Sequence, residues 1–63
     1  MKKVDKKQWF IVGLDVLEKE GFTRITIDNL CGLLQITKGA FYHHFKNIDG
    51  YIDSLMKYWL ELN

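Results

Sequence analysis

Hydrophobic side chains recur at helical spacing in four stretches of this chain, and this periodicity constrains the fold more than any other feature. Glycine, threonine or asparagine separates the stretches, and proline is absent. Because residues i, i+3, i+4 and i+7 lie on one side of a helix, each stretch predicts an amphipathic helix. The predicted helices cover about 5–20, 26–34, 38–45 and 47–63. The alternation in the stretch RITI is too short for a strand, so we expect an all-α fold.

Residues with capping side chains mark where three of these helices begin. Thr26, Thr37 and Asn47 can each accept a hydrogen bond from a free backbone N–H of the first helical turn. Gly21 follows the first helix, where a left-handed C-cap is usual, and Phe22 is expected to fold back onto that helix. The inward faces are predicted to hold Phe10, Gly13, Leu14 and Leu17, with Trp9 and Val16 beside them; then Ile27, Leu30, Cys31 and Leu34; and in the last helix Ile48, Tyr51, Ile52, Leu55, Met56, Trp59 and Leu62.

The chain has 63 residues and a single cysteine, Cys31, so it forms one small domain without an internal disulfide. We expect Cys31 to be a small buried hydrophobic residue. The basic N-terminus leads into no long apolar segment, which argues against a signal peptide. No stretch approaches the roughly 20 apolar residues of a membrane span. The sequence therefore predicts a cytoplasmic protein that does not bind to membranes.

The net charge is only +1, but its distribution is uneven. No Asp or Glu occurs between Asn29 and Ile48, whereas Lys38, Lys46, His43 and His44 lie in that interval. This pattern predicts a polarised, basic face. Four further lysines precede the first helix or begin it, and they are either a solvated tail or an arm that follows phosphates: Lys2, Lys3, Lys6 and Lys7.

The third predicted helix divides into two sides. Phe41 and Phe45 are four residues apart and share the inward side, so Lys38, Tyr42 and His43 must point elsewhere. Two short helices joined by a tight turn form a helix-turn-helix, whose second helix can enter the DNA major groove. A glycine near the start of that helix, Gly39, lets the backbone approach a phosphate closely. These features favour an interface with DNA.

The stretch GFTRITIDNLCGLLQITKGAFYHHFKN resembles the N-terminal DNA-binding region of TetR-type (tetracycline-repressor-like) transcriptional regulators. The resemblance extends from about Trp9 to Leu55, and its most specific part is ITKGAFYHHF. It implies a three-helix, homeodomain-like helix-turn-helix bundle over residues 1–46. A fourth helix over 47–63 would pack on this bundle and lead to a C-terminal ligand-binding and dimerisation domain, which is absent from this sequence.

The resemblance also implies residue roles and partners. Phosphate contacts are implied for Thr26, Thr37, Tyr42 and Lys46, and base-edge or backbone contacts for Lys38, Gly39, Ala40 and His43. The implied partner is double-stranded DNA carrying a pseudo-palindromic operator, and the implied role is that of a repressor. A homodimer and a small-molecule effector are expected only with the C-terminal domain, so these 63 residues alone are expected to be monomeric.

Two residues depart from the family pattern. Gln35 stands where the turn usually has glycine, which leaves open a different backbone conformation there. Ile48 stands where lysine is frequent, which removes one phosphate contact.

Other functions have weaker support in the sequence. Adjacent helical histidines point about 100° apart, so His43 and His44 cannot easily bind one metal ion together with Cys31. His44 is instead expected to be partly buried near the fourth helix. Neither an enzyme nor a cofactor is expected, because no nucleophile with a base, no paired carboxylates and no glycine-rich phosphate loop occurs. The alternative is a small helical protein-interaction module that uses the apolar face of the fourth helix, whose final residues Trp59, Leu60 and Leu62 resemble a surface for another domain.

Overall fold

The structure is a computed structural model, and it describes residues 4–62. Over this range it contains four α-helices and one short 3-10 turn, and it contains no strand. The elements are α1 (Lys6–Lys19), η1 (Phe22–Arg24), α2 (Ile27–Leu34), α3 (Lys38–His44) and α4 (Ile48–Leu62). The predicted all-α fold is confirmed, and each predicted helix is present.

The starts of the helices follow from local side-chain hydrogen bonds. Asp5 and Gln8 form a capping box at α1, since each side chain accepts a hydrogen bond from the other residue's backbone N–H at 3.0 Å. Thr26 Oγ1 accepts from Asn29 N at 3.1 Å, and Asn47 Oδ1 accepts from Gly50 N at 2.7 Å. Thr37 occupies the N-cap position of α3, but its side chain makes no capping hydrogen bond.

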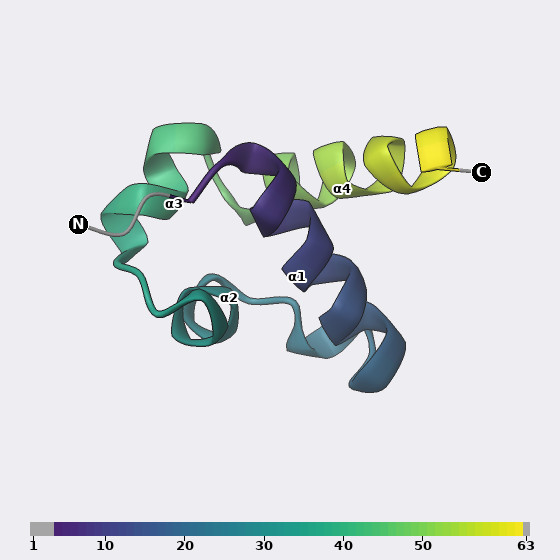
Figure 1. Cartoon of the computed structure of the whole chain (residues 1–63), viewed down its shortest axis with the longest axis horizontal. Coiled ribbons are helices and arrows are strands. Elements are labelled where there is room, and N and C mark those ends of the chain that lie inside the picture. The colour runs from purple at the N-terminus through teal and green to yellow at the C-terminus, as the bar shows by residue number, and fades with distance from the viewer. Residues whose placement is uncertain (1–3, 63) are drawn as a thin grey trace.

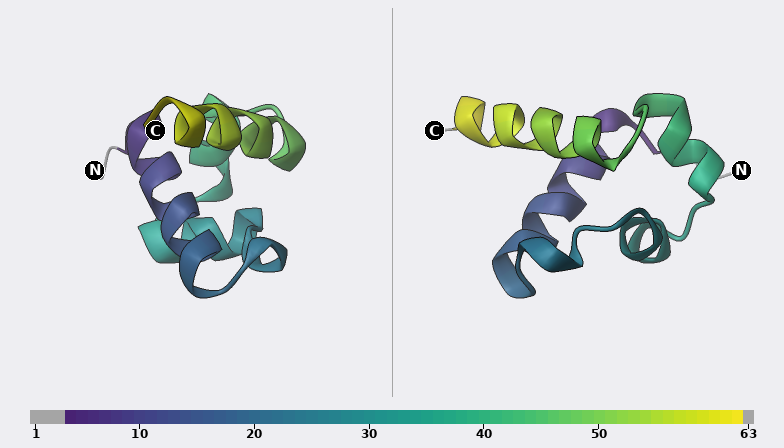
Figure 2. Two further views of the ribbon diagram at one scale, coloured as in Figure 1. Left: turned by 90° about the vertical axis from the view of Figure 1, so that its right-hand side faces the viewer. Right: turned by 180° about the vertical axis from the view of Figure 1, so that it is seen from behind.

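The first three helices form a small bundle, and α4 lies across it (Figure 1). Helix α1 packs against both α2 and α4, while α2 packs against α3. The far end of α4 extends past α1, away from α2 and α3, as the view from behind also shows (Figure 2). This arrangement leaves one side of α3 and the last turns of α4 uncovered. No helix within residues 4–62 has the length and apolar character needed to cross a lipid bilayer.

An aromatic cluster forms the centre of the core. Trp9 and Phe41 are fully buried, and their rings meet edge to face with centroids 5.5 Å apart. Phe45 packs edge to face against both Trp9 and Tyr51, with centroid distances of 6.3 and 4.9 Å. Edge-to-face contacts of this kind stabilise beyond simple area burial. Around the aromatic residues lie Val4, Val16, Ile25, Leu30, Cys31, Leu34 and Leu55, so Cys31 is buried as expected.

The inward face of α1 differs from the predicted one. Trp9, Gly13 and Val16 are buried, whereas Phe10 and Leu14 are only half-buried. Leu17 is half-buried as well. The helix is therefore rotated relative to the prediction by about one residue. Hydrophobic residues cover more than one stripe of α1, so periodicity alone did not identify the stripe that faces the core.

A contact between α1 and α4 explains this rotation. Tyr51 is fully buried, and its hydroxyl donates a 2.7 Å hydrogen bond to the backbone carbonyl of Trp9. Burial raises the pKa of Tyr51, so the hydroxyl stays protonated and can donate. The same hydroxyl lies against Gly13, where a Cβ atom would collide with it. Gly13 thus permits the close approach of α4 to α1.

The chain that leaves α1 also differs in detail from expectation. Gly21 has a φ of 93°, a glycine-favouring value, but its ψ of 170° is extended rather than left-handed helical. The chain then enters η1, which the sequence did not predict. Phe22 is 56% exposed, contrary to the expectation that it folds back onto α1.

Candidate nucleic-acid interface

Helices α2 and α3 are joined by a turn of three residues, and the backbone hydrogen bonds of this turn define its shape. Ile36 N donates to Cys31 O at 3.0 Å, and Gln35 N donates to Gly32 O at 3.3 Å. Together these bonds form a Schellman motif, in which the residue after the helix takes a left-handed conformation. Gln35 has φ 56° and ψ 50°, so it adopts the conformation that glycine favours. The turn therefore has the left-handed conformation expected for a glycine, although Gln35 replaces the glycine that is usual at this position.

The two sides of α3 are separated as the sequence predicts. Phe41 and Phe45 are buried in the aromatic cluster, and they hold the helix to the core. Lys38, Tyr42 and His43 are exposed, and we refer to these three residues as the α3 strip. Tyr42 is 55% exposed although it follows the buried Phe41 directly in the chain.

The remaining predicted site residues lie around this strip. Thr26 and Thr37 occupy the N-cap positions of α2 and α3, and Lys46 lies between α3 and α4; all three are exposed. Gly39 is exposed in the first turn of α3. Ala40 is half-buried and packs against the core, so it is the least accessible of the eight predicted residues. Ile48 is likewise half-buried against the core, which gives a structural reason for an apolar residue at that position.

A shallow pocket of about 310 Å³ lies where α2, α3 and α4 meet beside the strip. An ion pair lies in its lining, because Lys38 Nζ is 2.7 Å from Asp28 Oδ1. This hydrogen bond raises the pKa of Lys38, so the amino group is positively charged at neutral pH. The sequence analysis did not predict the pair. The sequence contained one indication of this ion pair. Asp28 lies near the start of α2 and Lys38 at the start of α3, and these two helices are joined by the same short turn.

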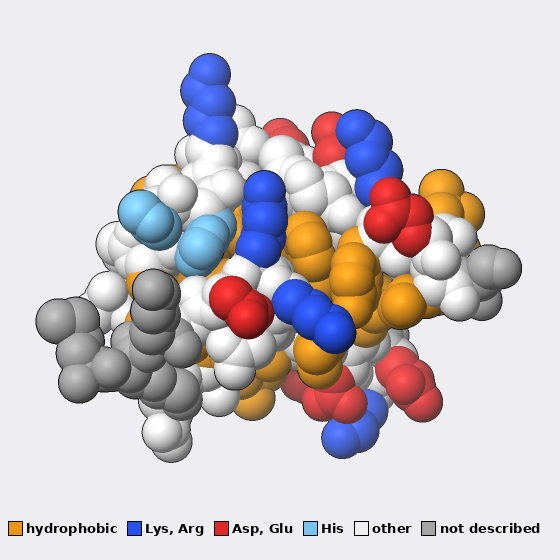
Figure 3. Space-filling view, turned by 45° about the horizontal axis from the view of Figure 1, so that its top comes forward, with side chains coloured by type: hydrophobic (Ala, Val, Ile, Leu, Met, Phe, Trp, Pro, Cys, Tyr) orange, Lys and Arg blue, Asp and Glu red, His pale blue; other side chains and the backbone are white. Residues whose placement is uncertain are grey.

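The two histidines have different surroundings (pale blue in Figure 3). His43 is exposed, whereas His44 is half-buried, as predicted. The hydrogen-bonding contact of His44 is with the start of the chain, since its Nε2 lies 3.2 Å from the carbonyl oxygen of Val4. Lys6 Nζ lies above the ring of Phe45, 5.4 Å from its centroid, so the beginning of α1 also contacts the end of α3. Of the other N-terminal lysines, Lys2 and Lys3 lie outside the described residues.

The described residues contain no group of three His, Cys, Asp or Glu side chains arranged to hold a metal ion. The rings of His43 and His44 are 5.1 Å apart and nearly perpendicular to each other. Burial, followed by the nearby Asp28 carboxylate, raises the pKa of Cys31 and so disfavours its thiolate, the form that binds metals.

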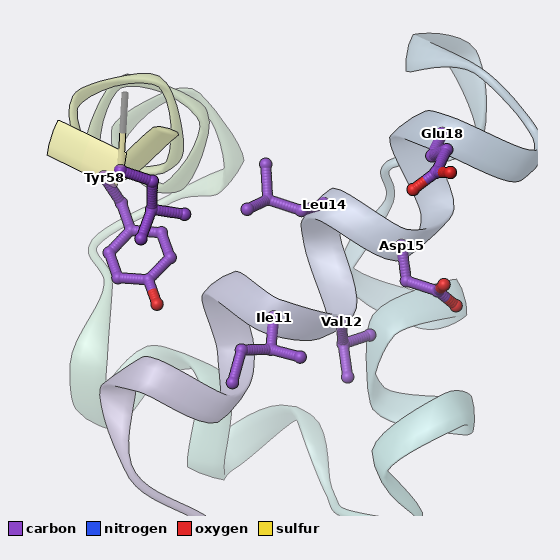
Figure 4. Close-up of a pocket in the computed structure, with 7 residues that line it drawn as sticks. Ile11, Val12, Leu14, Asp15, Glu18 and Tyr58 are labelled. Carbon is purple, nitrogen blue, oxygen red and sulfur yellow. The ribbon is translucent and has the colours of Figure 1, made fainter. Parts of the chain in front are cut away.

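A second surface feature lies between α1 and α4, at the end of the molecule away from α3. Leu14 of α1 points toward α4, and Tyr58 of α4 points toward α1 (Figure 4). The Tyr58 ring stacks on Phe10 with a centroid distance of 4.9 Å. A groove of about 380 Å³ separates the helices here, and it is lined by Ile11, Val12, Leu14, Asp15, Glu18, Tyr58 and Leu62. The last turns of α4 are apolar and open, because Trp59, Leu60 and Leu62 are 48%, 65% and 61% exposed.

Comparisons with known proteins match the part of the chain that contains α2, the turn and α3. The family described as "Bacterial regulatory proteins, tetR family" matches residues 12–54, which is most of the chain and includes α2 and α3. A 29-residue stretch is 52% identical to the Transposon Tn10 TetC protein of Escherichia coli. That match covers 46% of this chain and 15% of the TetC protein, so it spans much less than two thirds of the relative. No solved structure matches this chain.

The family match includes the helix-turn-helix and the core residues that hold it, and it favours DNA binding over the alternative of a protein-interaction module. The chain therefore belongs to the tetR family of bacterial regulatory proteins, and it carries the N-terminal DNA-binding domain of that family.

Proposed function

We propose that this domain reads a DNA operator by placing α3 in the major groove, and that the regulator acts as a repressor. One observation carries the proposal: Phe41 on one side of α3, and Phe45 directly after the helix, are buried in the core, while the opposite side presents the α3 strip. The major groove is about 12 Å wide, which is enough for an α-helix whose other side is held by a core. The α3 strip then faces the DNA, with Lys38 and His43 toward the base edges.

The surroundings of the strip support different roles for the eight residues, some contacting base edges and others contacting phosphates. We assign base-edge or nearby backbone contacts to four residues of α3: Lys38, Gly39, Ala40 and His43. We assign phosphate contacts to exposed donors at the two helix starts, on the side of α3 and just after it: Thr26, Thr37, Tyr42 and Lys46. Lysine can donate to guanine O6 and N7, and a small side chain such as that of Ala40 can pack on a thymine methyl.

We place residues 1–46 in the helix-turn-helix domain and residues 47–63 in a helix that leads to a ligand-binding and dimerisation domain. The exposed Leu60 and Leu62 support this, since such a domain would cover them. A two-fold dimer would put two α3 helices about 34 Å apart on a pseudo-palindromic operator. An effector bound in the second domain would move α4 and change that spacing.

A salt titration tests the proposal. A duplex enriched from a random pool by the purified chain is labelled, and binding is measured by fluorescence anisotropy at increasing salt. We expect the logarithm of the binding constant to fall linearly with the logarithm of salt, by about 0.9 per phosphate contacted. Binding that does not respond to salt would instead indicate apolar docking and contradict the proposal.

A matched pair of lysine variants locates the phosphate contact. Lys46→Ala should weaken binding to all duplexes and reduce the salt slope by about 1. Lys57→Ala removes the same charge from an exposed position on α4 and should leave the slope unchanged. Equal slopes for the parent and for Lys46→Ala would remove Lys46 from the interface.

A further inference from the structure

The ion pair between Asp28 and Lys38 joins two different helices of the helix-turn-helix. The pairs Asp15–Lys19 and Glu20–Arg24 join residues only four apart, and they lie on α1 or just after it. The Asp28–Lys38 pair instead connects the first turn of α2 with the first residue of α3, at a distance of 2.7 Å. It therefore fixes the position of the one lysine that belongs to the α3 strip.

Asp28 is also the acid that comes nearest to the proposed DNA surface in the sequence. No Asp or Glu occurs from residue 29 to residue 48, and Asp28 follows Thr26 by two residues. A carboxylate at this position repels phosphates unless a cation compensates its charge. The Lys38 amino group provides that compensation in the free domain.

The pair is weak enough for DNA to break it. The Lys38 side chain is 63% exposed and the Asp28 side chain 76% exposed, so water and salt screen their attraction. A lysine without such a partner moves freely on its four-carbon stem and reaches whichever phosphate is near. A lysine held by Asp28 keeps one direction until a better acceptor replaces the carboxylate.

We propose that Asp28 is a positioning residue that sets sequence specificity: it holds the Lys38 amino group at the α2–α3 junction, away from phosphates, so that only a suitably placed base acceptor displaces it. The inference rests on the proposed function, because it presumes that α3 lies in the major groove. It assigns to an acidic residue a role in discriminating among DNA sequences.

The test compares Asp28→Asn with the parent chain on a 16-base-pair duplex of random sequence and on the duplex enriched by the parent. Once freed, Lys38 should bind a phosphate on random DNA. We expect affinity for the random duplex to rise about two- to five-fold, the range that an exposed ion pair supports. The salt slope on that duplex should steepen by about 0.9. The ratio of enriched to random affinity should fall accordingly.

Two controls separate this role from a general effect of charge. Asp15→Asn removes an acid from another exposed ion pair, on α1, and should leave both the slope and the ratio unchanged. In a Lys38→Met background, Asp28→Asn should no longer alter the slope. If it still does, Asp28 acts directly on the phosphates and the proposal is wrong.

Folding and the proposed function are checked in the same experiment. Circular dichroism melting reports whether Asp28→Asn folds. Asp28→Ser is a second neutral replacement that suits the first turn of a helix, and it must give the same salt slope as Asp28→Asn. If the parent chain shows no salt-dependent binding to duplex DNA, the proposed function itself fails. If the parent binds and both neutral variants match its slope, only the role of Asp28 is overturned.

Discussion

Phe41 and Tyr42 are neighbours in the chain, yet one is fully buried and the other is more than half exposed. The helix turns about 100° between them, so a single residue step moves a side chain from the core to the surface. Their rings still meet edge to face, with centroids 5.4 Å apart. The position of Tyr42 on the surface is thus fixed by Phe41, the aromatic neighbour that anchors α3.

Replacing His43 and Tyr42 should have different effects on binding. His43→Ala removes a proposed base contact, so it should change which duplexes are enriched from a random pool more than it changes overall affinity. Tyr42→Phe keeps the ring on Phe41 and removes only the hydroxyl. It should therefore weaken binding to enriched and random duplexes by the same factor, because a phosphate contact carries no sequence information. Parallel selections with both variants measure the difference. Equal losses on both kinds of duplex for His43→Ala would contradict its role.

For individual residues, the sequence predicted that the α3 strip is exposed, but it did not predict that Lys38 pairs with Asp28. The spacing of Phe41 and Phe45 is enough to orient a helix of seven residues. The contact with Asp28, ten residues away, depends on how α2 and α3 cross. Charge patterns identify ion pairs reliably only within one helix, where the geometry is already known.

Among the elements, the turn between α2 and α3 contains a residue in an energetically unfavourable backbone conformation. Gln35 is the non-glycine residue with positive φ among the described residues, and a Cβ atom in this conformation is unfavourable. The Schellman bonds of Ile36 and Gln35 nevertheless hold the turn in place. The angle between α2 and α3 is thus maintained by hydrogen bonds against a local preference.

Gln35→Gly should stabilise the domain by about 0.5–1 kcal/mol. Relief of the left-handed conformation exceeds the greater freedom that glycine gives the unfolded chain. Gln35→Ala serves as the control, since it shortens the side chain without relieving the backbone, and it should bring no such gain. Urea unfolding of the three proteins measures the effect. A loss of stability in the glycine variant would mean that the Gln35 side chain itself holds the turn.

The contact between α1 and α4 is the other junction that depends on one residue. Gly13→Ala would raise helix propensity by about 1 kcal/mol, yet its Cβ collides with the Tyr51 hydroxyl, so we expect net destabilisation. Tyr51→Phe removes the colliding oxygen. Gly13→Ala should therefore cost less in a Tyr51→Phe background, with a coupling of at least about 1 kcal/mol. A double-mutant cycle by thermal or urea unfolding measures this coupling. Strictly additive effects would show that the two helices adjust their distance freely.

The whole molecule depends on a single aromatic cluster supplied by α1, α3 and α4. The sequence predicted its helices, the capping side chains Thr26 and Asn47, and the burial of Phe41, Phe45 and Cys31, because these follow from local spacing. The rotation of α1 could not be predicted, since it depends on where Tyr51 reaches Gly13, 38 residues earlier in the chain. Long-range packing decides among stripes of similar hydrophobicity.

Phe41→Ala should destabilise the domain by about 3–5 kcal/mol, the range for a buried aromatic residue. A domain of about 60 residues is only marginally stable, so this variant should be largely unfolded at room temperature. Phe22→Ala makes the same truncation at a residue that is 56% exposed, and it should change stability by no more than about 0.5 kcal/mol. Circular dichroism and urea unfolding of both variants distinguish the two sites. Similar melting curves for Phe41→Ala and the parent would mean that the core is misassigned.

The two tryptophans have contrasting surroundings. Trp9 has no exposed surface, and its indole nitrogen has no hydrogen-bond partner among the described residues, whereas Trp59 is about half exposed near the end of α4. Light emitted by Trp9 should therefore be blue-shifted and resist quenching by acrylamide, while emission from Trp59 should be red-shifted and readily quenched. The intrinsic fluorescence of the unlabelled chain thus contains two separate optical signals, one that follows unfolding of the core and one that follows anything that covers the end of α4.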